Sequence, residues 1–529
     1  MRPFPEAPYV FRGISMRRRV WSVVHPRLTW RYVLSAIAVF YVLYCYLFSL
    51  PLFASPLPMY SGQYPVGSID IESPVSPPRV IDTARFKGSF TNAFELQTVL
   101  FTLYYPAAHG KSQHKHHHWI SRPISATAKG YAKFAHISNC FTNAAFTGAL
   151  RALVGGIKIP AKVDTRLADL GPAVSSHPDI FESQEFEKVE SIERYGYPIV
   201  VFSHGMASSR TDYTHYAGEL ASRGFIVAML EHRDGSCPGS IITKHGKPYE
   251  TKLTFRLSEV ESETGHELGV EDFNRAQLDF REAEIEEVVR VLRQINSGKG
   301  SHVFKHNSRK EGKSLDEWAG RLNVDKMIMA GHSFGATGAL QALRGGPTEK
   351  RPFIGAIVLD PGKQSGRLNH DVSVPLLVIH SNSWSSKHSI FYGRAHFDVV
   401  RNLVEENNQR GSPSWFMTSL GTSHPSVTDA PIIEPTLLSW TTGAKINVHE
   451  GLRQYIHLSE DFLWFLGKGE KRNLLAEKAE FPQYDPGKGF GIWQPGQGDN
   501  EKDEGEWGDW RKYWQVHVSP EPDSDASAV

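Results

Sequence analysis

A short stretch near the middle of the chain, from Met327 to Leu343, restricts the possible folds more than any other part of the sequence. Its first residues, Met327 to Ala330, are apolar and predict a buried strand, and Ala336 to Leu343 predicts a helix. Residues 331–335 between them read Gly-His-Ser-Phe-Gly, which fits the G-x-S-x-G pattern of a nucleophile elbow. Glycine lets strand and helix approach closely in such a turn, and the serine stands above the sheet edge. We therefore predict a nucleophile at Ser333; a glycine-rich turn with a capping serine is the alternative.

The flanking segments alternate between apolar strands and helices. This alternation predicts right-handed βαβ units and an α/β fold, with a central, mostly parallel sheet flanked by helices. The expected strands cover residues 97–106, 198–203, 225–231, 354–360, 375–380 and 415–420, and the expected helices cover 217–223, 272–296 and 462–466. We assign residues 96–470 to this catalytic domain.

A serine hydroxyl needs a base to take its proton before it can attack. In this architecture the acid and the histidine follow the serine along the chain, each at the end of a later strand. Asp360 ends the apolar run 356–359, and His424 comes just after the strand 415–420. A turn cap at Asp360 and an ordinary loop histidine at His424 are the alternatives. Weaker rivals for the two roles are Asp371, Asp398, His380, His388 and His396.

Two backbone N–H groups are also needed to bind the oxyanion that forms during acyl transfer. We expect one from Phe334, directly after the serine, because the start of the following helix has unpaired N–H groups and a positive dipole end. The other is expected from the loop after the strand 198–203, where residues 204–206 read His-Gly-Met. An ordinary tight turn is the alternative reading of that loop.

The N-terminal part of the chain predicts a membrane anchor. Residues 1–31 contain seven arginines and one acid, and the 23 residues from Tyr32 to Ala54 carry no charge. A helix of that length crosses a hydrocarbon core of about 30 Å. We expect an uncleaved single-pass signal-anchor at 32–54 with a cytoplasmic N-terminus, in the secretory pathway. A cleaved signal peptide, or a mitochondrial presequence followed by an anchor, is the alternative.

Four other stretches carry weaker signals. Residues 55–95 are rich in proline, serine and glycine and predict a linker, stiff at Ser73–Pro78, together with the start of the catalytic domain. The histidines within His114–His118 predict a solvated loop, with a ligand cluster as the alternative. Phe141–Ile157 is either a core or lid helix or a helix that dips into a lipid surface. Residues 471–529 predict a polar, acidic tail that is mostly disordered from about Pro486 onward.

Composition and cysteine content argue against nucleic-acid binding and against a disulfide-stabilised fold. The net charge of +1 lacks the basic excess that is typical of a nucleic-acid-binding protein. Three cysteines allow at most one bridge, Cys140 to Cys237, and none has the spacing of a metal site. We expect no metal and no cofactor.

Short motifs spread over about residues 60–470 resemble the platelet-activating-factor acetylhydrolase family of the plasma and intracellular type II kind. The motifs are residues 202–206 (FSHGM), 224–227 (GFIV), 231–234 (EHRD), 331–335 (GHSFG), 359–360 (LD) and 421–424 (GTSH), with 64–67 (YPVG) and 103–106 (LYYP) as N-terminal signatures.

The resemblance implies an α/β-hydrolase fold and a triad of Ser333, Asp360 and His424, with Met206 and Phe334 donating backbone N–H groups. It implies a calcium-independent phospholipase A2 that removes short or oxidised sn-2 acyl chains, and a lipid-surface helix near Phe141–Ile157. The basic anchor and acidic tail indicate a larger, fungal-like, membrane-attached member. Another carboxylesterase or lipase on the same fold, and a catalytically silent membrane-tethered relative, remain open.

Overall fold

The computed structural model describes residues 29–47, 54–109, 115–169, 196–435, 442–487 and 510–521. The chain divides into an N-terminal unit, Met1–Leu52, and a main unit, Phe53–Val529, and each is taken here by itself.

The N-terminal unit contains one described helix, α2 (Trp30–Leu47). Its 18 residues rise about 27 Å, somewhat less than the hydrocarbon core of a bilayer. Among the residues that the structure describes, no helix combines the length and the apolar character that a membrane span needs. The transmembrane helix expected at residues 32–54 is therefore not supported, and the basic segment up to residue 28 lies outside the described residues.

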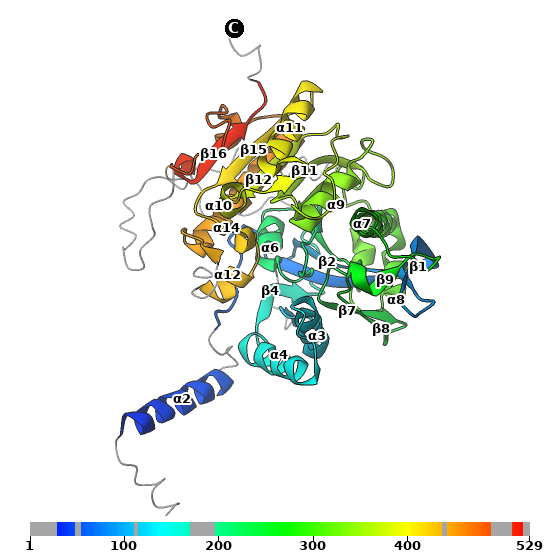
Figure 1. Ribbon diagram of the computed structural model, residues 1–529, viewed down its shortest axis with the longest axis vertical. Helices are drawn as coiled ribbons and strands as arrows, with labels where there is room; N and C mark the ends of the chain where they lie inside the picture. The colour runs from blue at the N-terminus through cyan, green and yellow to red at the C-terminus, as the bar shows by residue number, and fades with distance from the viewer. Residues whose placement is uncertain are drawn as a thin grey trace, which may run out of the picture. The chain divides into compact units, whose positions relative to one another are not determined.

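A single large sheet forms the centre of the main unit (Figure 1). The strand order is β16-β15-β12-β11-β10-β5-β6-β2-β1-β4-β3, and β9 pairs with β1. The six neighbours from β6 to β15 run parallel, whereas β2 and β16 join them antiparallel at either side. The parallel strands therefore end at one common edge. The strands are β1 (Val66–Phe86), β2 (Asn92–Pro106), β3 (His116–His118), β4 (Lys158–Val163), β5 (Ile199–Ser203), β6 (Ile226–Glu231), β9 (Val260–Glu261), β10 (Met327–His332), β11 (Phe353–Leu359), β12 (Leu376–Ser381), β15 (Ser414–Ser419) and β16 (Trp514–Val518).

Helices cover both faces of the sheet. One hydrophobic cluster joins it to α7 (Val270–Gln294), α9 (Phe334–Ala342) and α11 (His396–Gln409). A second cluster joins the other face to α6 (Thr214–Ser222) and α14 (Val448–Lys468). Alternate residues of β12 enter the two clusters, as a strand buried on both faces requires. The mixed α/β fold with a central sheet between helices is thus confirmed.

Shorter elements surround this core. They are α3 (Ile124–Phe134), α4 (Cys140–Leu153), α8 (Gly300–His306), α10 (Asn382–Ser386), α12 (Ala430–Ile433), the strand pairs β7 (Gly239–Lys244) with β8 (Lys247–Leu253) and β13 (Ile390–Phe391) with β14 (Arg394–Ala395), and the single turns η1 (Leu257–Glu259), η2 (Ile295–Lys299), η3 (Leu315–Trp318), η4 (His424–Val427), η5 (Asn473–Ala476) and η6 (Trp510–Tyr513).

The stiff linker expected at Ser73–Pro78 is instead part of β1. Pairing with β2 runs to Pro74, is interrupted by a register shift, and resumes at Arg79. Proline cannot donate to a ladder, so a strand accommodates it at an irregularity of this kind. The prolines therefore interrupt the pairing locally without ending the strand.

The tail that was expected to be mostly disordered from about Pro486 contains an ordered strand. Trp514–Val518 forms β16, which pairs with β15, and its alternate residues Trp514, Val516 and Val518 are buried. The apolar period of two in this segment is typical of a strand. The sheet therefore includes a strand beyond the expected limit of residue 470, whereas β1 lies within residues 55–95, where the start of the domain was expected.

Three smaller expectations also change. No side chain of α4 is buried, so the core-helix reading of this segment is wrong, and Phe141 is 87% exposed. His116–His118 forms a strand rather than a solvated loop, and His117 lies 2.9 Å from Glu311; His114 lies outside the described residues. Cys140 and Cys237 are both free.

Candidate active site

Ser333 occupies the turn between β10 and α9. Its backbone has φ 58° and ψ −121°, a left-handed conformation that few residues other than glycine adopt. A Cβ at Gly331 would lie 2.2 Å from the Gly335 carbonyl oxygen, and one at Gly335 would lie 2.0 Å from that of Ser203. Both positions therefore require glycine, and the predicted strand–turn–helix is confirmed.

Asp360 follows the last residue of β11 and is also held at positive φ, 47°. Its carboxylate accepts two hydrogen bonds from Ser381 at the end of β12, from the backbone N–H at 2.6 Å and from the hydroxyl at 2.7 Å. The residue is 2% exposed. The neighbouring strand thus fixes the direction in which the carboxylate points.

His424 is the first residue of η4, in the turn after β15. Its Nδ1 lies 2.8 Å from Asp360 Oδ2, and its Nε2 lies 3.1 Å from Ser333 Oγ. Its backbone N–H donates to Ser383 Oγ at 2.9 Å. Three side chains from distant parts of the sequence thus meet at the common edge of the parallel strands. With a proton on Nδ1, the imidazole can accept the Ser333 hydroxyl proton at Nε2.

Trp384 of α10 contacts this histidine although no sequence motif indicated it. Its ring lies nearly parallel to the His424 imidazole, with centroids 4.0 Å apart and 10° between planes. Its indole N–H donates to the Pro361 carbonyl at 3.1 Å. The ammonium group of Lys363 lies over the indole, 4.6 Å from a ring centroid. Burial lowers the pKa of Lys363 to about 8.

His332, the residue before the serine, packs against the same imidazole with ring centroids 4.5 Å apart. Its Nδ1 lies 2.9 Å from the hydroxyl of Tyr213, which accepts the Gly205 backbone N–H at 3.2 Å. Burial lowers the pKa of His332 well below its ordinary value of 6.5. In the sequence this residue was only a variable position of the elbow pattern.

The loop after β5 lies beside the serine, as the oxyanion prediction requires. A Cβ added at Gly205 would come within 3.1 Å of Ser333 Cβ. In the described part of the chain, the backbone N–H groups of Met206 and Phe334 have no protein acceptor. Both groups are therefore free to donate to a bound molecule.

The rival residues lie elsewhere. His380 and His396 are buried against one another behind Trp384, and His388 is exposed. Asp371 binds the backbone of Gly345, and Asp398 pairs with Arg401. Among the described residues, His424 is the hydrogen-bond partner of the Ser333 hydroxyl.

A second serine–histidine–carboxylate group lies beneath the first. Ser203 Oγ is 2.7 Å from His232 Nε2, and His232 Nδ1 is 2.6 Å from Glu284. None of these three residues is more than 1% exposed. Because no substrate can reach a hydroxyl at this depth, we assign this group a structural role.

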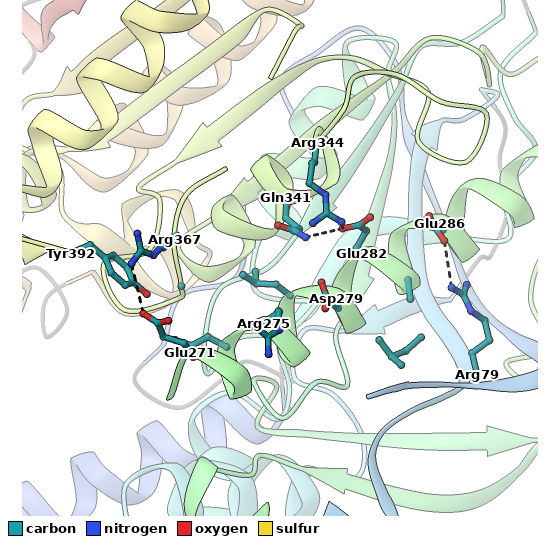
Figure 2. A pocket seen from close by; sticks show the side chains of 15 residues that line it. Arg79, Glu271, Arg275, Asp279, Glu282, Glu286, Gln341, Arg344, Arg367 and Tyr392 are labelled. Carbon is teal, nitrogen blue, oxygen red and sulfur yellow. Dashed lines mark hydrogen bonds and ion pairs between the residues drawn. The ribbon is translucent and has the colours of Figure 1, made fainter. Parts of the chain in front are cut away.

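A large open cavity of about 540 Å³ lies away from these residues, against α7 (Figure 2). Its charged side chains are largely paired with one another, as in Glu271 with Arg367 and Glu286 with Arg79. Ser333, Asp360 and His424 are not among its lining residues.

Comparison with known proteins agrees with the family suggested by the motifs. The model of "Platelet-activating factor acetylhydrolase, isoform II" matches residues 178–485. Platelet-activating factor acetylhydrolase of Cavia porcellus is 25% identical over 311 residues, 58% of this chain and 55% of that protein. The protein of the same name from Canis lupus familiaris is 32% identical over 168 residues, 31% of this chain and 35% of that protein.

The chain thus spans about half the length of the first relative and about a third of the second. A ferulic acid esterase from Streptomyces cinnamoneus is similar at a TM-score of 0.42 and 16% identity, over 81% of this chain and 96% of that one. The family match covers more than half of the chain and includes Ser333, Asp360 and His424, so the chain belongs to the platelet-activating factor acetylhydrolase isoform II family.

Proposed function

We propose that this chain is a serine carboxylic ester hydrolase with an α/β-hydrolase fold. Its proposed substrates are phospholipids with short or oxidised sn-2 acyl chains, as for a 1-alkyl-2-acetylglycerophosphocholine esterase. The observation that carries the proposal is the Ser333–His424–Asp360 contact, at 3.1 and 2.8 Å, in a member of this family.

In the proposed acylation step, His424 takes the hydroxyl proton of Ser333 as the oxygen attacks the sn-2 carbonyl carbon. Asp360 holds the proton on Nδ1 and stabilises the imidazolium. The N–H groups of Met206 and Phe334 bind the oxyanion. His424 then gives its proton to the leaving lysophospholipid oxygen, and the acyl group stays on the serine.

In the proposed deacylation step, His424 takes a proton from water, which attacks the acyl-enzyme carbonyl. Collapse of the second tetrahedral intermediate frees the fatty acid and returns the proton to Ser333. The chain's own side chains and backbone N–H groups handle every proton and charge in this route, so the proposal includes calcium independence.

We propose that α4 meets the lipid surface. Its N-terminus is closed by a capping box at Asn139, so the helix is well formed although it buries no side chain. Apolar side chains on and beside it are exposed, including Phe141 at 87%, Ile137 at 44% and Leu153 at 40%. An exposed apolar helix of this kind is typical of a lipid-contact surface.

The proposal is tested with phosphatidylcholines whose sn-2 chains run from acetyl to oleoyl, assayed with and without EGTA. We expect hydrolysis of the short chains, no effect of EGTA, and loss of both turnover and fluorophosphonate labelling in Ser333→Ala. Ser386→Ala, on an exposed residue of α10, is the matched control and should behave like the wild type.

Other outcomes would contradict the proposal. Labelling that persists in Ser333→Ala would move the nucleophile to another residue. Equal hydrolysis of acetyl and oleoyl chains would indicate a general lipase, and a folded wild-type protein without turnover or labelling would indicate a catalytically silent relative.

A further inference from the structure

His332 carries a ring nitrogen that the proposed reaction does not use. Its Nδ1 contacts Tyr213, but its Nε2 has no hydrogen-bond partner, although the residue is only 4% exposed. A buried polar atom without a partner is unfavourable and needs an explanation. The fold nevertheless holds this ring beside His424.

His332, Asp360 and His424 together form a possible ligand set. One ligand atom from each residue lies within 4.8 Å of the other two. They come from the ends of β10, β11 and the turn after β15, so rigid neighbouring strands support the set. Because bonds of about 2 Å bring ligand atoms closer together than this limit, the three side chains would move toward one another when an ion binds.

The partners that usually orient metal ligands are also present. The Tyr213 hydroxyl can accept a hydrogen bond from the N–H at His332 Nδ1, which leaves the lone pair of Nε2 free to bind an ion. Ser381 donates twice to the Asp360 carboxylate and fixes its direction. Two imidazoles and one carboxylate suit zinc and similar transition metals, whereas calcium and magnesium prefer oxygen ligands.

We propose that His332, Asp360 and His424 form an inhibitory site for a divalent transition metal of the zinc class. A fourth position is left for water or the Ser333 hydroxyl, as in three-ligand zinc sites. The metal-binding part of this inference stands by itself, and the inhibitory part rests on the proposed esterase function.

Binding removes the base in either coordination mode. An ion on His424 Nε2 occupies the lone pair that would accept the Ser333 proton. An ion on Nδ1 displaces the proton there, so that the neutral imidazole carries its proton on Nε2 and faces Ser333 as a donor. In both modes Asp360 also ceases to orient the imidazole.

The first test titrates ZnCl₂ into the short-chain esterase assay with wild-type protein, His332→Gln and His302→Gln. Zinc should inhibit the wild type, and EDTA should restore activity. In His332→Gln the half-inhibiting concentration should rise at least about tenfold, since loss of even an outer partner typically weakens metal binding about 10–100-fold. His302, exposed on α8 one turn before His306, is the control for an adventitious surface site, and its substitution should leave inhibition unchanged.

The second test needs no turnover. Co²⁺ is added to Ser333→Ala, which keeps all three ligands, and to the same variant with His332→Gln. We expect tetrahedral cobalt absorption in the first protein and its loss in the second, with thermal unfolding showing that both are folded.

The inference would be overturned if zinc does not inhibit the wild type and cobalt gives no tetrahedral absorption with Ser333→Ala. Inhibition that His302→Gln relieves and His332→Gln does not would assign it to the surface pair. If wild-type protein has no esterase activity but cobalt binds through His332, the site stands and the proposed function fails.

Discussion

At the scale of single residues, the imidazole of His424 is positioned by a ring stacked on its face as well as by hydrogen bonds at its two nitrogens. Trp384 stacks on the ring at 4.0 Å, and the hydrogen bond from Trp384 to Pro361 fixes the indole to the residue that follows Asp360. Rotation of the imidazole away from Ser333 would break this stack. Trp384 is thus a positioning residue for the proposed base.

We expect Trp384→Ala to lower kcat for a short-chain ester by up to about 100-fold with little change in KM, because a small misplacement of a reacting group has an effect of that size. Trp384→Phe keeps a stacking ring and should recover much of the loss. Steady-state kinetics of the wild type and both variants measures kcat and KM separately.

Trp464→Ala, on the partly exposed end of α14, is the matched control for removing an indole. An unchanged kcat in Trp384→Ala would assign Trp384 a structural role only. The same conclusion would follow if Trp384→Phe failed to recover the lost kcat and the melting temperature fell equally in both variants.

The three main site residues were accessible from sequence because each has a local signal. Ser333 lies in a glycine pattern, and Asp360 and His424 each follow an apolar strand. Trp384 and His332 carry no such signal, since their contacts with His424 arise only when separate strand ends are brought to one edge.

At the scale of elements, the start of α6 is capped by a residue from another part of the chain. Tyr213 at the N-cap position provides no side-chain hydrogen bond. Instead, the carboxylate of Asp429 accepts the backbone N–H groups of Thr214 at 2.8 Å and His215 at 2.9 Å. Asp429 is fully buried, and burial raises its pKa from 3.8 to about 6.

This cap predicts a pH-dependent contribution to stability. Because the pKa of Asp429 is higher in the folded state, folding takes up a proton between about pH 4 and 6. The contribution of Asp429 to the free energy of unfolding is therefore greatest below that range, falls by at most about 3 kcal/mol as pH rises through it, and stays constant above it.

Asp429→Asn cannot titrate. We expect the variant to be less stable than the wild type, because the amide nitrogen of asparagine cannot accept the backbone N–H group that one carboxylate oxygen accepts. The difference in the free energy of unfolding between the two proteins should shrink as pH rises from about 4 to 6. Urea unfolding of both proteins at intervals from pH 4 to 8 measures this difference. A gap that grows with pH would show that the carboxylate is charged throughout.

Elements also differ in how well their own residues predict them. β5, β10 and β12 were expected because they are short apolar runs between turns. β1 was missed because its prolines resemble a linker, and β16 because it follows an acidic stretch. Pairing with β2 and β15 stabilises these two strands, and such long-range partners leave no mark in the local sequence.

At the scale of the whole molecule, one buried arginine connects α7 with the sheet and with the start of α9. Arg281 is 0% exposed and pairs with Asp234, in the turn after β6, at 2.7 Å. It also donates to the His204 carbonyl at 2.7 Å and to Ser203 Oγ at 3.1 Å, and it lies 4.2 Å from the ring of Phe334. A charged residue type ordinarily predicts exposure to solvent, so no local sequence signal indicates that Arg281 is buried on the apolar face of α7.

We therefore expect Arg281→Met to lower the free energy of unfolding by about 3–5 kcal/mol, because it leaves the buried charge of Asp234 without its cationic partner. Adding Asp234→Asn removes that charge, so the double variant should be more stable than the sum of the two single changes implies. Urea unfolding of the four proteins gives the coupling energy. Arg275→Met, in the exposed pair with Asp272 on the same helix, should change stability by less than about 1 kcal/mol. Strictly additive effects at Arg281 and Asp234 would mean that packing of the arginine side chain, rather than its charge, joins the helix to the sheet.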